Sequence, residues 1–203
     1  MSYRRIEKRM SWDAQIVLWI NGHYAEWLDQ VMWVISRANT WIALYVLLVG
    51  LIVYRYRNWR SVLFILIGFG IAVGLSDYTC SGILKPLVCR PRPTHEPALE
   101  GMLHLVNGYT GGLYGFCSSH AANTMAAAVL FSLLWRNQIV TASLMTWVTL
   151  IAYSRIYVGV HYPSDIVTGW LIGALFAVAA YWALRCCLHS LRADDEAVPP
   201  GDS

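Results

Sequence analysis

Residues that could bind and cleave a phosphate ester are concentrated in three short stretches of this 203-residue chain. We name them motif 1 (residues 85–93, KPLVCRPRP), motif 2 (residues 117–120, CSSH) and motif 3 (residues 154–165, SRIYVGVHYPSD). Lysine and arginine match the charge of a phosphate dianion, and an arginine binds two of its oxygens at once. A histidine near a carboxylate is a candidate nucleophile, and a second histidine is a candidate proton donor.

His161 in motif 3 is the candidate nucleophile. A neutral imidazole can attack phosphorus, and a carboxylate on its other nitrogen fixes the tautomer and stabilises the imidazolium as it forms. Asp165 follows four residues later, one turn away if this stretch is helical. A purely structural alternative exists, because Pro163 suits the first position of a helix and Asp165 would then lie in its first turn. The presence of the other motifs favours the catalytic interpretation.

His120 in motif 2 is the candidate general acid, which would protonate the leaving oxygen and then activate water. A lone histidine at the start of a helix is more often structural, but this one directly follows Ser118 and Ser119 before an apolar segment. Free N–H groups at a helix start bind anions, and we expect Ser118 and Ser119 to contact phosphate there. Ser118 would also suit the N-cap, a role compatible with phosphate binding.

Lys85, Arg92 and Arg155 are the expected phosphate clamp. Negative charge spreads over the equatorial oxygens in the transition state, and fixed cations aimed at them lower the barrier. Lys85 alone would also fit a side chain that extends to the lipid headgroups. Arg90 is either a fourth cation of the clamp or a headgroup contact, and Asp77 either orients Lys85 or, as we prefer, marks the water interface.

No metal and no cofactor is expected. The histidines and acidic residues of the loop from Thr94 to Phe116 match no spacing of metal ligands. The same loop is rich in glycine, which is typical both of a mobile lid and of a plain connector.

The composition indicates an integral membrane protein. Hydrophobic residues make up 57% of the chain and charged residues only 13%, against about 25% charged in soluble domains. The 10 Trp and 12 Tyr fit aromatic belts at the bilayer interfaces. A net charge of +3 is too small to indicate a nucleic-acid partner. The expected partners are membrane lipids and a phosphorylated lipid substrate.

The apolar segments predict an all-α bundle with about six transmembrane helices. Five spans are clear, namely 41–54, 62–75, 121–134, 140–153 and 166–184. Trp12 to Ile35 contains polar residues, so it either spans, lies in the interface or breaks near Asn21-Gly22. We expect an interfacial piece followed by a first membrane helix. Residues 1–191 would form one domain, and residues 192–203 a disordered cytoplasmic tail.

The loops predict which side the motifs face. Arg55, Arg57 and Arg60 mark one loop as cytoplasmic, and Arg136 marks another. All three motifs then fall on the outer side. The cations of motifs 1 and 3 break the positive-inside preference there, which indicates that they have another task.

The five cysteines fit no zinc pattern. Cys186 and Cys187 are adjacent near the end of an apolar run, and we interpret them as thiols packed in the membrane, with reversible acylation as the alternative. Cys80 and Cys89 could pair if their loop faces an oxidising space, although nothing in the sequence requires it.

The three motifs resemble those of the type 2 phosphatidic acid phosphatase (PAP2) superfamily of membrane lipid phosphatases. The family pattern is Lys, six residues, Arg-Pro; then Pro-Ser-Gly-His; then Ser-Arg, five residues, His, three residues, Asp. Motifs 1 and 3 match fully and in order, whereas Cys117 stands where Pro is usual and Ser119 where Gly is usual. The resemblance covers about residues 70 to 180.

This resemblance implies a six-helix core with its site at the outer membrane–water interface. It implies metal-independent hydrolysis of a lipid phosphate or pyrophosphate through a phosphohistidine on His161. Candidate substrates are polyprenyl pyrophosphate, phosphatidylglycerol phosphate, phosphatidic acid and a phosphate on lipid A. The small size resembles bacterial members, so we expect a bacterial inner membrane with the site facing the periplasm or the exterior.

Three alternatives remain at this point. The same site would serve a lipid phosphotransferase if an acceptor hydroxyl replaced water. A non-catalytic protein that binds phospholipids or conducts anions would also need the cations, but not the histidine pair with Asp165. Soluble vanadate-dependent haloperoxidases share the three motifs, but the apolar spans argue against that class.

Overall fold

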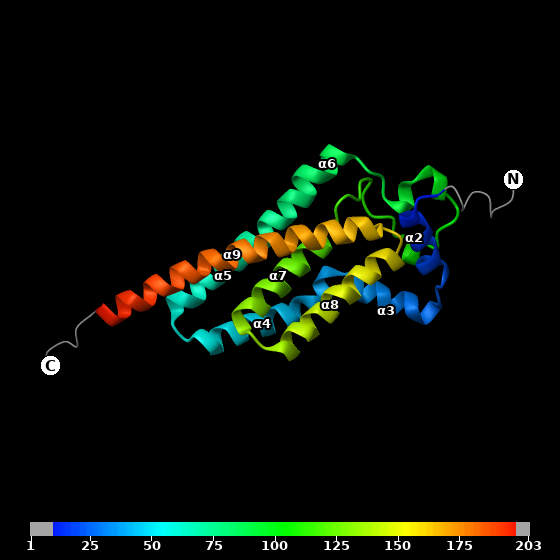
Figure 1. Ribbon diagram of the computed structural model, residues 1–203. Coiled ribbons are helices and arrows are strands. Elements are labelled where there is room, and N and C mark those ends of the chain that lie inside the picture. The colour runs from blue at the N-terminus through cyan, green and yellow to red at the C-terminus, as the bar shows by residue number, and fades with distance from the viewer. Residues whose placement is uncertain (1–9, 198–203) are drawn as a thin grey trace.

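The computed structural model describes residues 10–197, and the side chains of residues 10–188. Its chain folds into an elongated bundle of helices (Figure 1). The α-helices are α2 (Trp12–Gly22), α3 (Glu26–Ser36), α4 (Ile42–Tyr56), α5 (Trp59–Asp77), α6 (Lys85–Val88), α7 (Ser119–Trp135), α8 (Gln138–Tyr157) and α9 (Pro163–Ala197). Residues 10–197 contain no β-strand, only an isolated bridge between Pro91 and Tyr114. The predicted all-α class is confirmed.

Short helical turns connect the long helices. They are the 3₁₀ turns η1 (Ala38–Trp41), η3 (Pro93–His95), η4 (Pro97–Leu99) and η5 (Val106–Gly108), and the π-helical η2 (Tyr78–Leu84). η2 and α6 extend α5 without a break toward motif 1.

Four helical runs among residues 10–188 are long and apolar enough to cross a membrane. They are Ala38–Tyr56, Trp59–Val88, Gln138–Tyr157 and Pro163–Leu188, and they contain four of the five predicted spans. The fifth, 121–134, lies within α7, which has 17 residues. α7 packs against α5, α8 and α9 in the middle of the bundle (Figure 1).

The N-terminal segment breaks near Asn21-Gly22, which was one of the alternatives considered. α2 and α3 have 11 residues each, or about 16 Å of helix, roughly half the thickness of the hydrocarbon core. A first membrane helix within residues 12–35 is therefore not formed. The side chain of Asn21 explains the break, since its Nδ2 donates to the carbonyl oxygens of His104 (2.9 Å) and Tyr157 (2.8 Å).

Helices α7 and α9 pack at unusually short range through small residues. Gly169 and Gly173 of α9 face Ala122 and its neighbours on α7, and a Cβ at Gly173 would lie 2.1 Å from the carbonyl oxygen of Ala122. Glycines four residues apart let helix backbones approach closely in membranes. This contact brings motif 2, at the start of α7, close to motif 3, which leads into α9.

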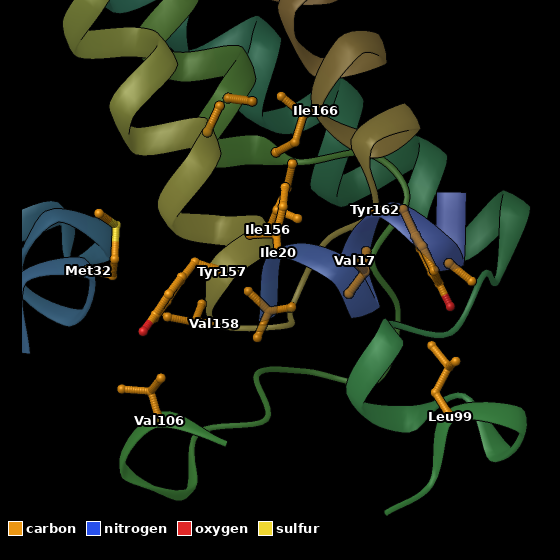
Figure 2. Packing of buried hydrophobic residues seen from close by; sticks show 14 residues of the cluster. Val17, Ile20, Met32, Leu99, Val106, Ile156, Tyr157, Val158, Tyr162 and Ile166 are labelled. Carbon is orange, nitrogen blue, oxygen red and sulfur yellow. The ribbon is translucent and has the colours of Figure 1, made fainter. Parts of the chain in front are cut away.

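The loop from Thr94 to Phe116 is anchored to the core rather than free. Figure 2 shows Leu99 and Val106 of this loop beneath Val17 of α2 and Val158, at the end of α8. Leu99 is 2% exposed and Val106 is 1% exposed. The loop that the sequence assigns to a lid or a connector is therefore fixed at two points.

The two ends of the described chain lie at opposite ends of the bundle (Figure 1). α9 continues to Ala197 and includes residues 192–197, which the sequence assigns to the tail. The N-terminal basic cluster (residues 4–9) and residues 198–203 lie outside the described residues.

Candidate active site

The three motifs meet at one end of the bundle, around a cavity of about 350 Å³. Six of the eight predicted site residues line it: Lys85, Arg92, Ser119, His120, Arg155 and His161. Ser118 and Asp165 do not line it and lie directly behind it. The N–H of Ser118 donates to the carbonyl oxygen of Asp165 (3.1 Å), which joins motif 2 to motif 3.

His161 and Asp165 form the pair that the spacing predicts. Nδ1 of His161 lies 3.4 Å from Oδ2 of Asp165, which also accepts from the N–H of Tyr162 (3.0 Å). Both residues are buried, at 1% and 0% exposed. Because Nδ1 faces the carboxylate, Nε2 is the nitrogen left for the cavity. α9 begins at Pro163 with Asp165 in its first turn. A structural role of Asp165 at the start of this helix is therefore compatible with its candidate catalytic role.

Motif 2 is arranged around the start of α7. Ser118 is the N-cap, and its Oγ accepts from the N–H of Ala121 (3.4 Å). Ser119 points to motif 1, where its Oγ accepts from Nζ of Lys85 (3.0 Å) and bonds to Oγ of Ser81 (2.7 Å). The hydroxyl that replaces the usual glycine therefore orients the lysine.

Two guanidinium groups in the cavity wall have N–H donors without a protein acceptor. Nη1 of Arg155 donates to Oγ of Ser36 (2.6 Å), and Nε of Arg92 donates to the carbonyl oxygen of Tyr114 (3.2 Å). Nε of Arg155 and Nη1 of Arg92 are buried and, among the described residues, make no hydrogen bond. A buried charged donor without an acceptor is costly. Both side chains line the cavity, so an anion bound there would offset their charges.

Burial and the neighbouring cations keep both imidazoles neutral at pH 7. Burial, and then the charges of Arg155, Lys85 and Arg92, lower the pKa of His120 to about 4. Burial, followed by the same cations, lowers the pKa of His161 well below its usual value. A neutral His161 has the free electron pair that a nucleophile needs.

Ser36 and Tyr109 belong to the site although the sequence analysis did not single them out, and Asp77 lies there too. Ser36, at the end of α3, holds Arg155, and Tyr109 lines the cavity with its ring centre 5.9 Å from the Arg155 guanidinium carbon. Asp77, which we expected at the water interface, lines the cavity and accepts from Nδ2 of Asn123 (3.0 Å). Only the polarity of Asp77 and Ser36 at the ends of apolar runs could have indicated them.

Arg90 is paired with two carboxylates. It does not line the cavity and instead forms ion pairs with Asp13 (2.7 Å) and Asp165 (3.1 Å). The sequence contains no indication that the N-terminal helix supplies an acidic partner.

A disulfide joins Cys80 to Cys117, so the suggested pairing of Cys80 with Cys89 is wrong. Cys80 lies in η2 at the end of α5 and faces the residue that precedes Ser118. Cys89 follows α6 and is exposed. The disulfide therefore ties the helix that leads into motif 1 to motif 2.

No group of three or more His, Cys, Asp or Glu side chains in the described part of the chain is placed to hold a metal ion. The side chains that line the cavity include four cations, Arg37, Lys85, Arg92 and Arg155, against the carboxylate of Asp77. They suit an anion.

The comparisons with known proteins agree with this geometry. The PAP2 superfamily model matches residues 65–186. A lipid A 4'-phosphatase of Porphyromonas gingivalis is 32% identical over 94% of this chain and 83% of its own length. A lipid A 4'-phosphatase of Bacteroides thetaiotaomicron is 29% identical over 89% of this chain and 79% of its own length.

Among solved structures, Aquifex aeolicus LpxE superimposes with a TM-score of 0.64 at 22% sequence identity, over 85% of this chain and 96% of that one. That likeness concerns the fold. The family model covers more than half of the chain and contains all three motifs that surround the cavity, so the chain belongs to the PAP2 superfamily.

Proposed function

We propose that this protein is a membrane phosphatase that hydrolyses a phosphate monoester on a lipid through a phosphohistidine at His161. One observation carries the proposal. The side chains of Arg92 and Arg155 line the same cavity as His161 and His120. A site of this kind can hold a phosphoryl group, attack it and protonate what leaves.

The first half-reaction forms the phosphoenzyme. Nε2 of His161 attacks phosphorus while the bond to the ester oxygen breaks, and His120 gives its proton to that oxygen. Lys85, Arg92 and Arg155 hold the equatorial oxygens as their charge grows. Asp165 accepts the Nδ1 proton of His161 in a hydrogen bond and stabilises the positive ring.

The second half-reaction releases phosphate. His120, neutral after its proton is lost, takes a proton from water as the water oxygen attacks phosphorus. The P–N bond breaks, and its electron pair returns to Nε2 of His161. His120 then carries the proton for the next turnover.

His120 needs a proton that burial and the neighbouring cations disfavour, since together they lower its pKa to about 4. A bound phosphate offsets the charges of Lys85, Arg92 and Arg155, which are the neighbours that lower this pKa. A substrate that arrives as the monoanion also brings the proton with it. Substrate binding thus switches His120 from neutral to protonated.

The surroundings of the site support a lipid whose phosphate is carried by a polar group. The cavity continues past His120 into a space of about 260 Å³ lined by Trp33, Arg37 and Asn39, side chains suited to a sugar or another polar leaving group. The named relatives are lipid A 4'-phosphatases. A phosphate on the sugar of a lipid such as lipid A is therefore our first candidate.

An apolar crevice beside the site supports a hydrocarbon tail. It measures about 290 Å³, lies among α4, α5 and α7, and shares Tyr45 and Asn123 with the main cavity. Polyprenyl pyrophosphate and phosphatidylglycerol phosphate remain substrate candidates on this ground. A phosphotransferase would use the same first half-reaction with a lipid hydroxyl in place of water.

We propose that the site opens at the outer face of a bacterial inner membrane. Arg57 and Arg136 lie in the α4–α5 and α7–α8 connections, at the opposite end of the bundle from the site (Figure 1). Positive charges favour the cytoplasmic side. The Cys80–Cys117 disulfide lies at the site end, and disulfides persist in oxidising compartments. The segments that cross the bilayer would be helices α4, α5, α8 and α9 and residues 121–134 of α7. Helices α2 and α3 would lie at the interface.

Purified protein in detergent tests the proposal against four lipids: lipid A, polyprenyl pyrophosphate, phosphatidylglycerol phosphate and phosphatidic acid. We expect phosphate release from at least one, highest with lipid A, unchanged by EDTA and abolished by His161→Ala. Lipid binding without any turnover would support a non-catalytic binder. Full activity of His161→Ala would reject the phosphohistidine, and activity restored after EDTA by one divalent ion would reject metal independence.

A further inference from the structure

The two carboxylate oxygens of Asp165 face different partners. Oδ2 is on the side of His161, at 3.4 Å from its Nδ1. Oδ1 accepts from Nη1 of Arg90 at 3.1 Å. The orientation of this carboxylate, and with it the orientation of the His161 ring, therefore depends on where Arg90 lies.

Arg90 is in turn fixed on three sides. Its Nη2 donates to Oδ2 of Asp13 (2.7 Å), and its Nη1 donates to Oγ of Ser164 (2.6 Å) as well as to Asp165. Its guanidinium carbon lies 3.8 Å from the centre of the Tyr162 ring. A planar guanidinium with several donors can satisfy all of these contacts at once, whereas a lysine ammonium cannot.

Asp13 connects Arg90 to the N-terminal helix α2. It lies in the first turn of α2 and is 4% exposed. Its Oδ1 accepts from the N–H of Ser164 (3.0 Å), and its Oδ2 accepts from the Ser164 hydroxyl. α2 is thus bound to the first turn of α9, where Asp165 lies.

The charges explain why all three groups are needed. Asp165 is 0% exposed, and a buried carboxylate is costly without a charged partner and hydrogen bonds. The groups that face this carboxylate are Arg90, His161 and the ring of Tyr162. Asp13 lies on the far side of Arg90, and Arg92 lies near Gly115. Arg90 is the cation bonded to its carboxylate, and Asp13 balances the second half of that guanidinium.

We propose that Asp13 and Arg90 are positioning residues for the nucleophile, acting through Asp165 to hold the His161 ring in line for attack. This inference rests on the proposed function. Neither residue lines the cavity, so neither is expected to contact substrate. Their loss should reduce kcat and leave KM nearly unchanged.

The test compares Asp13→Asn, Arg90→Lys and Arg90→Gln with wild-type protein in detergent on the best substrate of the lipid panel. We expect kcat to fall roughly 10- to 100-fold, as for a misplaced reacting group, with KM within about twofold. Ser164→Ala, which keeps the N–H that Asp13 accepts, should have a smaller effect. Matched controls are Arg136→Lys, which breaks one bond to Tyr181, and Glu26→Gln, an exposed first-turn carboxylate of α3; both should retain the wild-type kcat.

The pH dependence separates positioning from a general loss of structure. Arg90→Gln removes the cation nearest Oδ1 of Asp165, so this carboxylate accepts a proton more readily and the acid limb of the kcat profile moves to higher pH. Arg90→Lys keeps the charge and should leave the limb near its wild-type position despite a lower kcat. A merely structural role would reduce the amplitude without moving the limb.

Each outcome has a distinct meaning. Wild-type kcat in Arg90→Lys and Asp13→Asn, or a raised KM at unchanged kcat, would overturn the positioning role while the proposed function stands. No turnover by wild-type protein on any lipid would instead overturn the proposed function. If the Arg90 and Asp13 variants fail to fold, the kcat of Ser164→Ala decides, and a wild-type value there overturns the proposal.

Discussion

Adding a single methyl group at Gly173 should separate α9 from α7 and damage the site at their ends. The Cβ of an alanine there would lie 2.1 Å from the carbonyl oxygen of Ala122 and 3.0 Å from the N of Ala126. Both atoms belong to the backbone of α7, so no side-chain rotation can relieve the contact. Ordinary contact begins near 3.4 Å, so the two helices must move apart by about 1 Å, because interiors are close-packed.

The sign of the stability change follows from two opposing effects. Alanine stabilises a helix interior by up to about 1 kcal/mol relative to glycine. Overpacking costs about 1–3 kcal/mol, and a collision with backbone belongs at the upper end of that range. We therefore expect Gly173→Ala to lower the free energy of unfolding by about 2 kcal/mol, or roughly 5 °C in melting temperature for a chain of this size.

The effect on catalysis should be larger than the effect on stability. α7 carries His120, and His161 immediately precedes α9, so a shift of about 1 Å changes their separation and is expected to reduce kcat roughly 100-fold. The assay is phosphate release by purified protein, together with thermal unfolding followed by tryptophan fluorescence.

Gly50→Ala is the matched control. Gly50 lies in the interior of α4, and a Cβ there meets nothing within 4 Å. Its melting temperature should be equal or higher, with the wild-type kcat. If Gly173→Ala were as stable and as active as Gly50→Ala, the close contact of α7 with α9 would not be what places the site.

Two further predictions concern acid and the disulfide. His120 has a pKa of about 4 in the folded chain, against 6.5 in the unfolded chain. The free energy of unfolding should therefore fall as the pH drops from about 6.5 toward 4. Melting temperatures measured at pH 7.5 and at pH 5 should differ less for His120→Gln than for wild type. Removing the Cys80–Cys117 disulfide, which spans 37 residues, should cost about 4 kcal/mol in chain entropy; the Cys80→Ala/Cys117→Ala protein should melt well below the Cys89→Ala control, and equal melting would refute this.

The sequence predicts those parts of the site that depend on the spacing of residues close together in the chain. Asp165 follows His161 by four positions, the spacing of about one helical turn, and Pro163 marks where the helix begins. The same holds for Ser118 as the cap of α7 and for the break after Asn21. Apolar length alone predicts four long helices, because the bilayer thickness sets it.

The missed contacts depend on which helices become neighbours. Asp13 and Arg90 are 77 positions apart, and nothing in either local sequence indicates that α2 docks beside α9. Cys89 and Cys117 both follow Cys80 in the sequence. Cys80 pairs with Cys117 because η2 packs against the start of α7. In the N-terminal segment, Asn21 is 1% exposed and bonds to the carbonyl oxygens of His104 and Tyr157, long-range partners that its local sequence does not indicate.

Four contacts around the site have a common effect, since together they join the three motifs to one another. Lys85 bonds to Ser119 and Cys80 to Cys117, which connects motif 1 and the turn before it with motif 2. The N–H of Ser118 bonds to the carbonyl oxygen of Asp165, which connects motif 2 with motif 3. Arg90 bonds to Asp165, which connects motif 1 with motif 3. Every pair of motifs is therefore linked directly, so the cations and imidazoles that line the cavity are already fixed relative to one another. A phosphate ester that bound there would need little of its binding energy to assemble them.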